Sequence, residues 1–499
     1  MCLKHASKAL FSTIFHSFAG YQPGLTRGIL RQEPIVSVYE FKGQNVSMSN
    51  IVLRIAALVL CFGILFGFGM TSLTGVLDAL AERFELDTAA QEILVSILVI
   101  CCFIGAILAG PLSSRYGRRV CMLFAAALMI LCYVLILGEP TYTGLLVARC
   151  GLGLGIGLSS MVVPMYAAEV TVARHRGAVV ALFQLAITAG ILIAYSVSFL
   201  FALTWPWTHV LGVGVVFAVA ALLLARALPE SPHWLAAVGQ SKKARQVASS
   251  LGLHTELPEL DESAQAHRDT EALTTTRPAP ASASRRSIVS VLALCGGLFV
   301  LQNLSGIDGI LYYAPHIFQT MGFDAGKAAL GATLGLGLVN FLATLVALKY
   351  VDTAGRRPLL LYGAALMSIG MGMVTLASLY QWSWMGLAGL CLFIMAFAIS
   401  LGPLPYVMMS ELFPTAFREK GIAAASSISW LFNALIAFTF LTVVQWISLT
   451  GVLLFFLGVC LLSWLIAYLY LPETRGTSLE RIEANVISGK RLRDLGRNE

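Results

Sequence analysis

Four polar residues interrupt one of the most apolar parts of the chain, the stretch LQNLSGIDGILYYAP at residues 301–315. Gln302 and Asn303 carry amides, which donate and accept hydrogen bonds without bringing a charge into apolar surroundings. Asp308 is an acid, which would cost about 2.5 to 3.5 kcal/mol if it were charged at the centre of a bilayer. These residue types predict a binding site for a hydrogen-bonding ligand, with Asp308 either protonated or paired with a cation.

Arg149 is the only other charged residue that we place deep in an apolar stretch. An enzyme would need a nucleophile with a base, paired carboxylates or a ligand cluster, and the sequence offers none of these in its apolar stretches. It also has no GxxxxGK[ST] phosphate-binding loop, and its ten cysteines lack the spacing of a metal site. We therefore predict that the protein is not an enzyme and uses no cofactor or metal.

The composition places the elements that position these residues in a membrane. Of 499 residues, 58% are hydrophobic and 12% are charged, and apolar runs recur that are long enough to cross a hydrocarbon core, which needs about 20 helical residues. The runs lack the alternation of barrel strands. We predict an all-α membrane protein with twelve transmembrane helices, at residues 51–77, 91–112, 119–138, 143–167, 177–200, 207–228, 288–318, 328–350, 358–380, 384–410, 421–446 and 450–471.

Lys and Arg are shared unevenly between the two sides of these helices. The connections after helices 2, 4, 6, 8 and 10 are rich in them, whereas the connecting loops of the other side hold only Arg83 and Lys327. The positive-inside rule places this basic side, and both termini, in the cytoplasm of a cell membrane. The net charge of +7 reflects this topology. The sequence has no basic patch with interleaved aromatic residues that would indicate binding to nucleic acid. We therefore expect the protein to be surrounded by the lipid bilayer and not to bind nucleic acid.

Short motifs recur in the same order about 240 residues apart. YGRR at 116–119 matches AGRR at 354–357, and LPES at 228–231 matches LPET at 471–474. The repeat predicts two pseudo-symmetric six-helix halves that bind a solute between them near the midplane. The predicted organisation is an N-terminal cytoplasmic extension (1–50), a first half (51–228), a cytoplasmic linker with short helices (229–287), a second half (288–471) and a C-terminal cytoplasmic tail (472–499).

Gly, Pro and polar residues interrupt the first and fourth helices of each half, at FGILFGFGMTSLTG, GLGLGIGLSSMVVP, QNLSGIDG and SLGPLPY. Irregular backbone at membrane depth is tolerated where it lines a cavity or is buried in protein. Helices 1, 4, 7 and 10 are therefore predicted to surround the solute path. The alternative is that the glycines allow close helix packing, which is the stronger interpretation for helix 4 taken alone.

The motifs SRYGRR, PMYAAEVTVARHRG, LPESPHWL, QNLSGIDGILYYAP, VDTAGRRPLL and SELFPTAFREKG, in this order, resemble those of the sugar porter family of the major facilitator superfamily. The resemblance implies a central sugar site and alternating access by rocking of the halves, as a uniporter or a proton symporter. We expect a transporter of a monosaccharide, either a hexose or a pentose. A polyol or inositol transporter and a non-transporting sugar sensor are the alternatives, and the short tail after Leu471 favours transport over sensing.

Carried over by position, the sugar-contacting residues of the family fall on polar and aromatic side chains of five helices. Amides suit a sugar because its hydroxyls both donate and accept, and an aromatic ring can cover the apolar face of a pyranose. The alternative for a buried amide is a hydrogen bond to a neighbouring helix. The predicted substrate-binding residues are Gln184, Gln302, Asn303, Asp308, Asn340, Tyr406, Trp430 and Asn433.

Charged residues at the helix ends of the basic side form a second set. The resemblance implies that they pair between helices when the cytoplasmic side is closed. Exposed pairs contribute roughly 0 to 1 kcal/mol each, which can bias an equilibrium without locking it. Solvated positive-inside charge is the alternative. The predicted gate residues are Arg118, Arg119, Glu169, Arg176, Glu230, Arg356, Arg357, Glu411 and Arg418.

The chain departs from the family pattern at positions that bear on sugar preference, gating and energy coupling. Asn303 stands where glutamine is usual, Tyr406 where tryptophan is usual, His233 where arginine is usual, and Ser114 where aspartate is frequent. Proton-coupled relatives carry an aspartate in helix 1 at the position of Gly69. Taken alone, this glycine favours a facilitator.

Asp308 stands where the family usually has an asparagine. We hypothesise that it takes over the proton-carrying role that is absent at Gly69, with Arg149 as the cation that stabilises its charged form when the site is empty. The alternative is a uniporter in which Asp308 accepts a hydrogen bond from a hydroxyl of a sugar or polyol.

Overall fold

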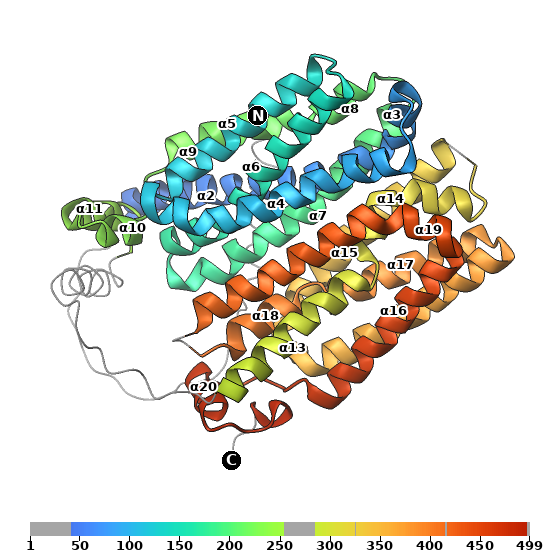
Figure 1. Ribbon diagram of the computed structural model, residues 1–499. Helices are drawn as coiled ribbons and strands as arrows, with labels where there is room; N and C mark the ends of the chain where they lie inside the picture. Colours follow the sequence, from blue (N-terminus) through green and yellow to red (C-terminus); the bar gives the residue numbers. More distant parts are fainter. Residues whose placement is uncertain (1–40, 254–284, 325, 415–416, 497–499) are drawn as a thin grey trace.

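The structure is a computed structural model that describes residues 41–253, 285–324, 326–414 and 417–496. Two helix bundles lie side by side, the first coloured blue to green and the second yellow to red (Figure 1). The helices of both bundles run in roughly the same direction, so their ends gather at two opposite sides of the molecule. The two bundles correspond to the two predicted halves.

The first half contains six membrane-spanning elements. Helix 1 consists of α2 (Phe41–Thr71), a 3₁₀ turn (Ser72–Gly75) and α3 (Leu77–Phe84), so the last ten residues of the predicted extension continue the first helix. The other five are α4 (Thr88–Tyr116), α5 (Arg118–Leu137), α6 (Tyr142–Val170), α7 (Ala173–Phe201) and the pair α8 (Trp207–Gly212) and α9 (Gly214–Ala227).

The second half repeats this plan. Helix 7 consists of α13 (Arg285–Leu304) and α14 (Ile307–Thr320), and it is followed by α15 (Lys327–Ala354), α16 (Arg356–Tyr380), α17 (Ser383–Ile399) with α18 (Leu404–Leu412), and α19 (Arg418–Tyr470). Eleven apolar spans are present in the described residues, but α19 leaves helical geometry at Ser448 (φ 65°, ψ 162°) and so contains two of the predicted helices. The twelve-helix prediction is confirmed.

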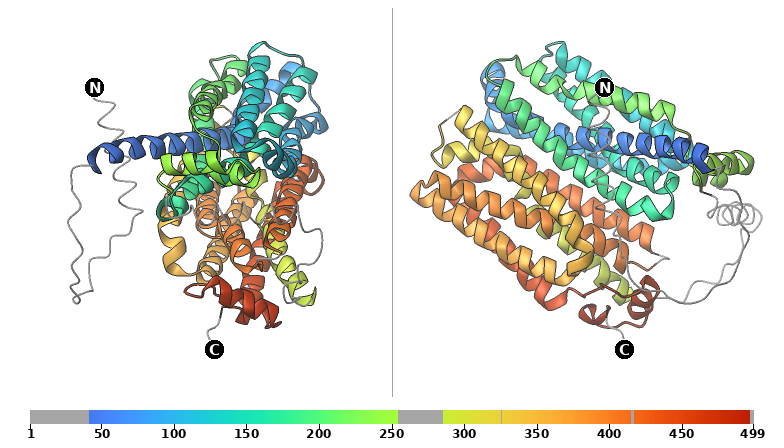
Figure 2. Two further views of the ribbon diagram at one scale, coloured as in Figure 1. Left: turned by 90° about the vertical axis from the view of Figure 1, so that its left-hand side faces the viewer. Right: turned by 180° about the vertical axis from the view of Figure 1, so that it is seen from behind.

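The described helices of the linker and the tail lie at the basic side, at one end of both bundles. The linker begins with two short helices, α10 (Pro232–Ala237) and α11 (Ser241–Ser250). The tail contributes α20 (Leu479–Ile487), which lies at the same end (Figures 1 and 2). Residues 254–284 of the linker lie outside the described part of the chain.

Helix 4 is not broken, which corrects one prediction. The element α6 is continuous over 29 residues, and two of its glycines, Gly153 and Gly157, lie against α4. A Cβ atom at Gly153 would overlap with the carbonyl oxygen of Leu98, and one at Gly157 would overlap with that of Cys102. The glycines therefore allow the backbones of two helices to approach closely, which is the alternative interpretation given above. The predicted breaks in helices 1, 7 and 10 are all present.

Candidate functional site

The break in helix 7 depends on Gly306, which lies between α13 and α14. Its backbone has φ 94°, in the left-handed region that favours glycine. A Cβ atom there would overlap with the ring of Phe456, which belongs to helix 12 and is buried. The break turns the last residues of α13 and the first residues of α14 toward a common space between the halves.

Gln302 links this break to the break in helix 10. Its Nε2 donates to the carbonyl oxygen of Gly402 at 2.9 Å, between α17 and α18, where the interrupted helix leaves carbonyl groups without their regular partners. The other amide atom, Gln302 Oε1, is buried and has no hydrogen-bond partner. Asn303, the next residue, donates from Nδ2 to Phe299 O at 2.7 Å and to Ser429 Oγ at 3.2 Å.

A cavity of about 220 Å³ lies between the halves at these breaks. Residues of helices 1, 5, 7, 8, 10 and 11 line the cavity. None of the described residues that line it belongs to helix 4. The structure brings all eight predicted substrate-binding residues to this cavity, namely Gln184, Gln302, Asn303, Asp308, Asn340, Tyr406, Trp430 and Asn433. Their role as substrate contacts remains a prediction.

Asp308 lies in the first turn of α14 and lines the cavity. Its Oδ2 is buried without a hydrogen-bond partner. The side chain of Asn433 lies beside it and accepts a hydrogen bond from the hydroxyl of Tyr312 at 3.1 Å. Gln302 and Asp308 thus each carry a buried acceptor atom that a ligand hydroxyl could satisfy.

Arg149 does not form the expected ion pair with Asp308. Its buried guanidinium donates to three backbone carbonyl oxygens, those of Leu94 (3.2 Å) and Val95 (3.4 Å) in α4 and that of Gly69 (3.2 Å) in α2. Gly69 is close to the end of α2, where carbonyl groups lack intrahelical partners and a cation is favourable. Arg149 therefore joins helices 1, 2 and 4 inside the first half, and no described cation pairs with Asp308.

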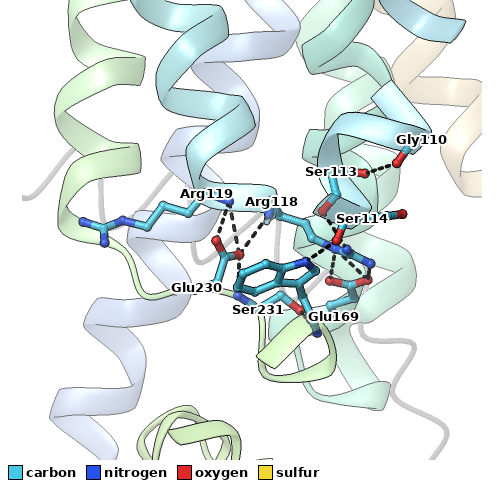
Figure 3. A network of polar contacts seen from close by, with 9 residues as sticks. Gly110, Ser113, Ser114, Arg118, Arg119, Glu169, Glu230 and Ser231 are labelled. Carbon is cyan, nitrogen blue, oxygen red and sulfur yellow. Dashed lines mark hydrogen bonds and ion pairs between the residues drawn. The ribbon is translucent and has the colours of Figure 1, made fainter. Parts of the chain in front are cut away.

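Among the described residues, predicted gate charges pair between neighbouring helices of the same half. Arg118 binds Glu169 at 2.9 Å, and Arg356 binds Glu411 at 2.9 Å in the equivalent place of the second half. Figure 3 shows the network of the first half. Both pairs are largely buried. The side chains of Arg176 and Arg418, which the sequence grouped with the two glutamates, lie outside the described part of the structure.

Glu230 caps the N-terminus of α5. Its carboxylate accepts hydrogen bonds from the backbone N–H groups of Arg118 (3.0 Å), Arg119 (3.1 Å) and Ser231 (2.8 Å) (Figure 3). The Arg119 side chain extends away from this cap and donates to the carbonyl oxygens of Ala225 and Arg226, at the end of α9. Carboxylates are favourable at helix N-termini because four N–H groups there lack partners.

Glu473 plays the same part in the second half, although it was not among the predicted gate residues. It accepts hydrogen bonds from the N–H groups of Arg356 and Arg357, both at 3.1 Å, at the start of α16. Arg357 also donates to the carbonyl oxygen of Tyr468 near the end of α19. The repeated LPE motif was the signal that could have identified this cap.

Glu230 gives a pH-dependent prediction. Burial raises the pKa of its carboxyl group above the ordinary 4.5, while the N–H groups of Ser231, Arg119 and Arg118 act in the opposite direction. Because the folded state binds this proton more tightly than the unfolded chain, the stabilisation by protonation is fully present below the ordinary pKa and is lost as pH rises through the raised pKa. The thermal midpoint of the wild type relative to that of Glu230→Gln should therefore decrease as the pH rises above the ordinary pKa of 4.5. Fluorescence-detected unfolding in detergent measures it, and a constant difference would contradict the prediction.

The two halves are joined by hydrogen bonds at the side opposite the basic side. The hydroxyl of Tyr195 donates to the carbonyl oxygen of Leu311 at 2.6 Å, and that of Thr74 donates to the same atom at 3.3 Å. Gln319 binds Asp78 farther out. On the other side of the cavity, the side chain of Tyr406 is 48% exposed. The cavity is therefore sealed from the opposite side and opens toward the basic side.

Comparison with known proteins agrees with this architecture. A family model described as "Sugar (and other) transporter" matches residues 37–486. The galactose-proton symporter of Escherichia coli K12 is 32% identical over 91% of this chain and 98% of its own length. The probable polyol transporter 6 of Arabidopsis thaliana is 30% identical over 88% of this chain and 94% of its own length.

A solved structure shares the fold. The xylose transporter XylE from E. coli in an inward-open conformation aligns with a TM-score of 0.72 and 26% identity, over 87% of this chain and 99% of its own. Family match, curated relatives and fold agree over the two halves described above. The chain belongs to the sugar (and other) transporter family of membrane proteins.

Proposed function

We propose that the protein carries a monosaccharide across the cell membrane by alternating access, in symport with a proton. The observation that carries this proposal is the cavity at the breaks of helices 7 and 10, where Gln302 and Asp308 hold buried acceptor atoms without partners. A sugar hydroxyl donates to such an atom, and the lining amides also accept and donate. The galactose-proton relative supports the coupling to protons.

The orientation follows from the charges. With the basic side in the cytoplasm, the cavity opens inward, and the hydrogen bonds to Leu311 close the external side. Both termini then lie in the cytoplasm. Alternating access requires these external contacts to separate while the basic side closes.

The proton site is the part of the proposal that differs from the family pattern. Gly69 cannot bind a proton, and its carbonyl oxygen is held by Arg149. Asp308 is the acid that lines the cavity in the described structure. A proton on Asp308 would neutralise a carboxyl group that has no cation partner, which lowers the cost of burying it.

Uptake of radiolabelled hexose and pentose into proteoliposomes, with and without an inward proton gradient, tests the proposal. Accumulation above equilibrium only with the gradient supports symport. Saturable equilibration that ignores the gradient would mean uniport and would make Asp308 a hydrogen-bonding residue. No uptake above that of empty liposomes, for any monosaccharide, would contradict sugar transport.

Gln302→Leu should weaken sugar binding about tenfold or more, because the change removes a buried acceptor and leaves the carbonyl of Gly402 without its donor. The half-saturation concentration of equilibrium exchange measures this. Gln91→Leu is the matched control, since Gln91 does not line the cavity and its amide donates to the carbonyl oxygen of Leu86 within its own half. Equal effects of both variants would contradict a role of Gln302 in binding.

A polyol is the second candidate substrate, favoured by the carboxyl group of Asp308 and by the resemblance to a probable polyol transporter. Asp308 in its charged form only accepts hydrogen bonds, and an acyclic polyol offers flexible hydroxyl donors. Competition against hexose uptake distinguishes the two. If linear polyols compete with hexose uptake more strongly than any unlabelled hexose or pentose does, the substrate is a polyol and not a monosaccharide.

A further inference from the structure

Glu92 is an acid buried between the two halves, and it was not among the residues predicted from the sequence. It lies in the second turn of α4 in the first half, and only 3% of its surface is exposed. One carboxylate oxygen accepts from the backbone N–H of Thr442 at 2.7 Å, and the other accepts from the Thr442 hydroxyl at 2.6 Å. Thr442 belongs to α19 in the second half, 350 residues away.

The surroundings of this pair extend the contact between the halves. One turn farther out, Gln445 of α19 donates to the Thr88 hydroxyl of α4 at 2.6 Å. Within the second half, Tyr313 of helix 7 donates to Ala437 O at 3.0 Å, and its ring stacks on that of Phe440 with 5.0 Å between the ring centroids. Tyr313 is also the residue at which α14 leaves helical geometry (φ −118°, ψ 21°).

Both donors to Glu92 come from the opposite half. When the halves separate on this side, the carboxylate must exchange both hydrogen bonds for water. The contact therefore contributes free energy only to the state that is open toward the basic side. An interaction present in one of two states shifts the equilibrium by its own free energy.

We propose that Glu92 and Thr442 form a latch on the side opposite the basic side, which sets the balance between the two access states of the transporter. The proposal rests on the proposed function, because it assumes alternating access. It adds a positioning role for two residues that lie outside the cavity. Hydrogen bonds to a charged group contribute more free energy than neutral ones. We therefore expect the Glu92–Thr442 pair to stabilise the state open toward the basic side more than the neutral hydrogen bonds to Leu311 do.

The test measures half-saturation concentrations for sugar separately on the two sides of oriented membrane vesicles. Glu92→Ala removes both contacts, so the population open toward the basic side should fall by roughly tenfold or more. The half-saturation concentration should then rise on the basic side and fall on the opposite side. A defect in the sugar site would instead raise it on both sides.

Two further variants keep the proposal testable if Glu92→Ala does not fold. Glu92→Gln can still accept the N–H of Thr442 and donate to its hydroxyl, but both hydrogen bonds are then neutral, so it should shift the two values in the same directions as Glu92→Ala by a smaller factor. Thr442→Val loses one hydrogen bond and should shift both values in the same directions as Glu92→Ala, by a smaller factor. The double variant Glu92→Ala/Thr442→Val should have the same half-saturation concentrations as Glu92→Ala alone.

Thr439→Val is the matched control. Thr439 lies about one turn from Thr442 in α19, and its hydroxyl donates within its own helix to Leu435 O at 2.8 Å. Unchanged values in Glu92→Ala, changes in the same direction on both sides, or equal shifts in Thr439→Val would each overturn the latch. These outcomes presuppose wild-type uptake, so a wild type without uptake refutes the proposed function rather than the latch.

Discussion

Gly306→Ala is expected to abolish sugar transport. An L-residue in the left-handed conformation of Gly306 costs about 1 to 2 kcal/mol, and the added Cβ atom would overlap with the Phe456 ring, which is 2% exposed. Because this ring is buried, it cannot move aside without disturbing helix 12. The change should therefore distort the break that places Gln302 and Asp308 at one cavity. Uptake by proteoliposomes, with the thermal midpoint in detergent, measures the result.

Gly297→Ala is the control for this prediction. Gly297 lies in α13 of the same helix 7, where an alanine methyl group would have no atom of a neighbouring helix within 4 Å, and its φ is not positive. Alanine should be tolerated there and should favour the helix by about 1 kcal/mol. Wild-type uptake in Gly306→Ala, or loss of uptake in Gly297→Ala, would show that the geometry of the helix 7 break is not what matters.

Asp308→Asn should abolish accumulation of sugar against its gradient while leaving exchange at equilibrium intact. The amide keeps nearly the same shape and still binds hydroxyl groups, but it cannot take up a proton. The ratio of internal to external sugar under an inward proton gradient should fall to one. Radiolabelled accumulation and counterflow, measured on the same proteoliposomes, separate the two effects.

Asp308→Glu keeps a carboxyl group and should retain part of the accumulation. If Asp308→Asn still accumulates sugar, the proton binds elsewhere and Asp308 serves as a hydrogen-bond acceptor. If Asp308→Asn loses exchange as well as accumulation, the carboxyl group is needed for binding the sugar. Either result would remove Asp308 from the role that replaces the acid absent at Gly69.

The fold was predictable because apolar runs and turn residues report directly on membrane helices. The turn at Ser448, for example, falls between the predicted helices 421–446 and 450–471. The polar and glycine-rich stretch around Gly306 also identified a true break. The same signal failed in helix 4, because glycines that allow close packing and glycines that interrupt a helix look alike in sequence.

Residue partners were less predictable than residue positions. The resemblance to a family named eight residues that line the cavity, of which Gln302, Asn303 and Asp308 lie on the motif QNLSGIDGILYYAP. It could not show that Arg149 binds three carbonyl groups of its own half, because that contact depends on how three helices pack. Glu92 was missed because an acid near the start of a predicted span resembles an ordinary interfacial residue, and its partner lies 350 residues away.

The cap formed by Glu473 has a consequence for shortening the protein. A chain cut after Leu471 would keep all twelve membrane helices, yet it would lose the carboxylate that holds the N–H group of Arg356, 117 residues earlier. The loss of structure would therefore occur at the start of α16, which is helix 9. Its first turn should show the largest loss of protection from amide hydrogen exchange. The boundary of the smallest intact transporter lies beyond its last membrane helix.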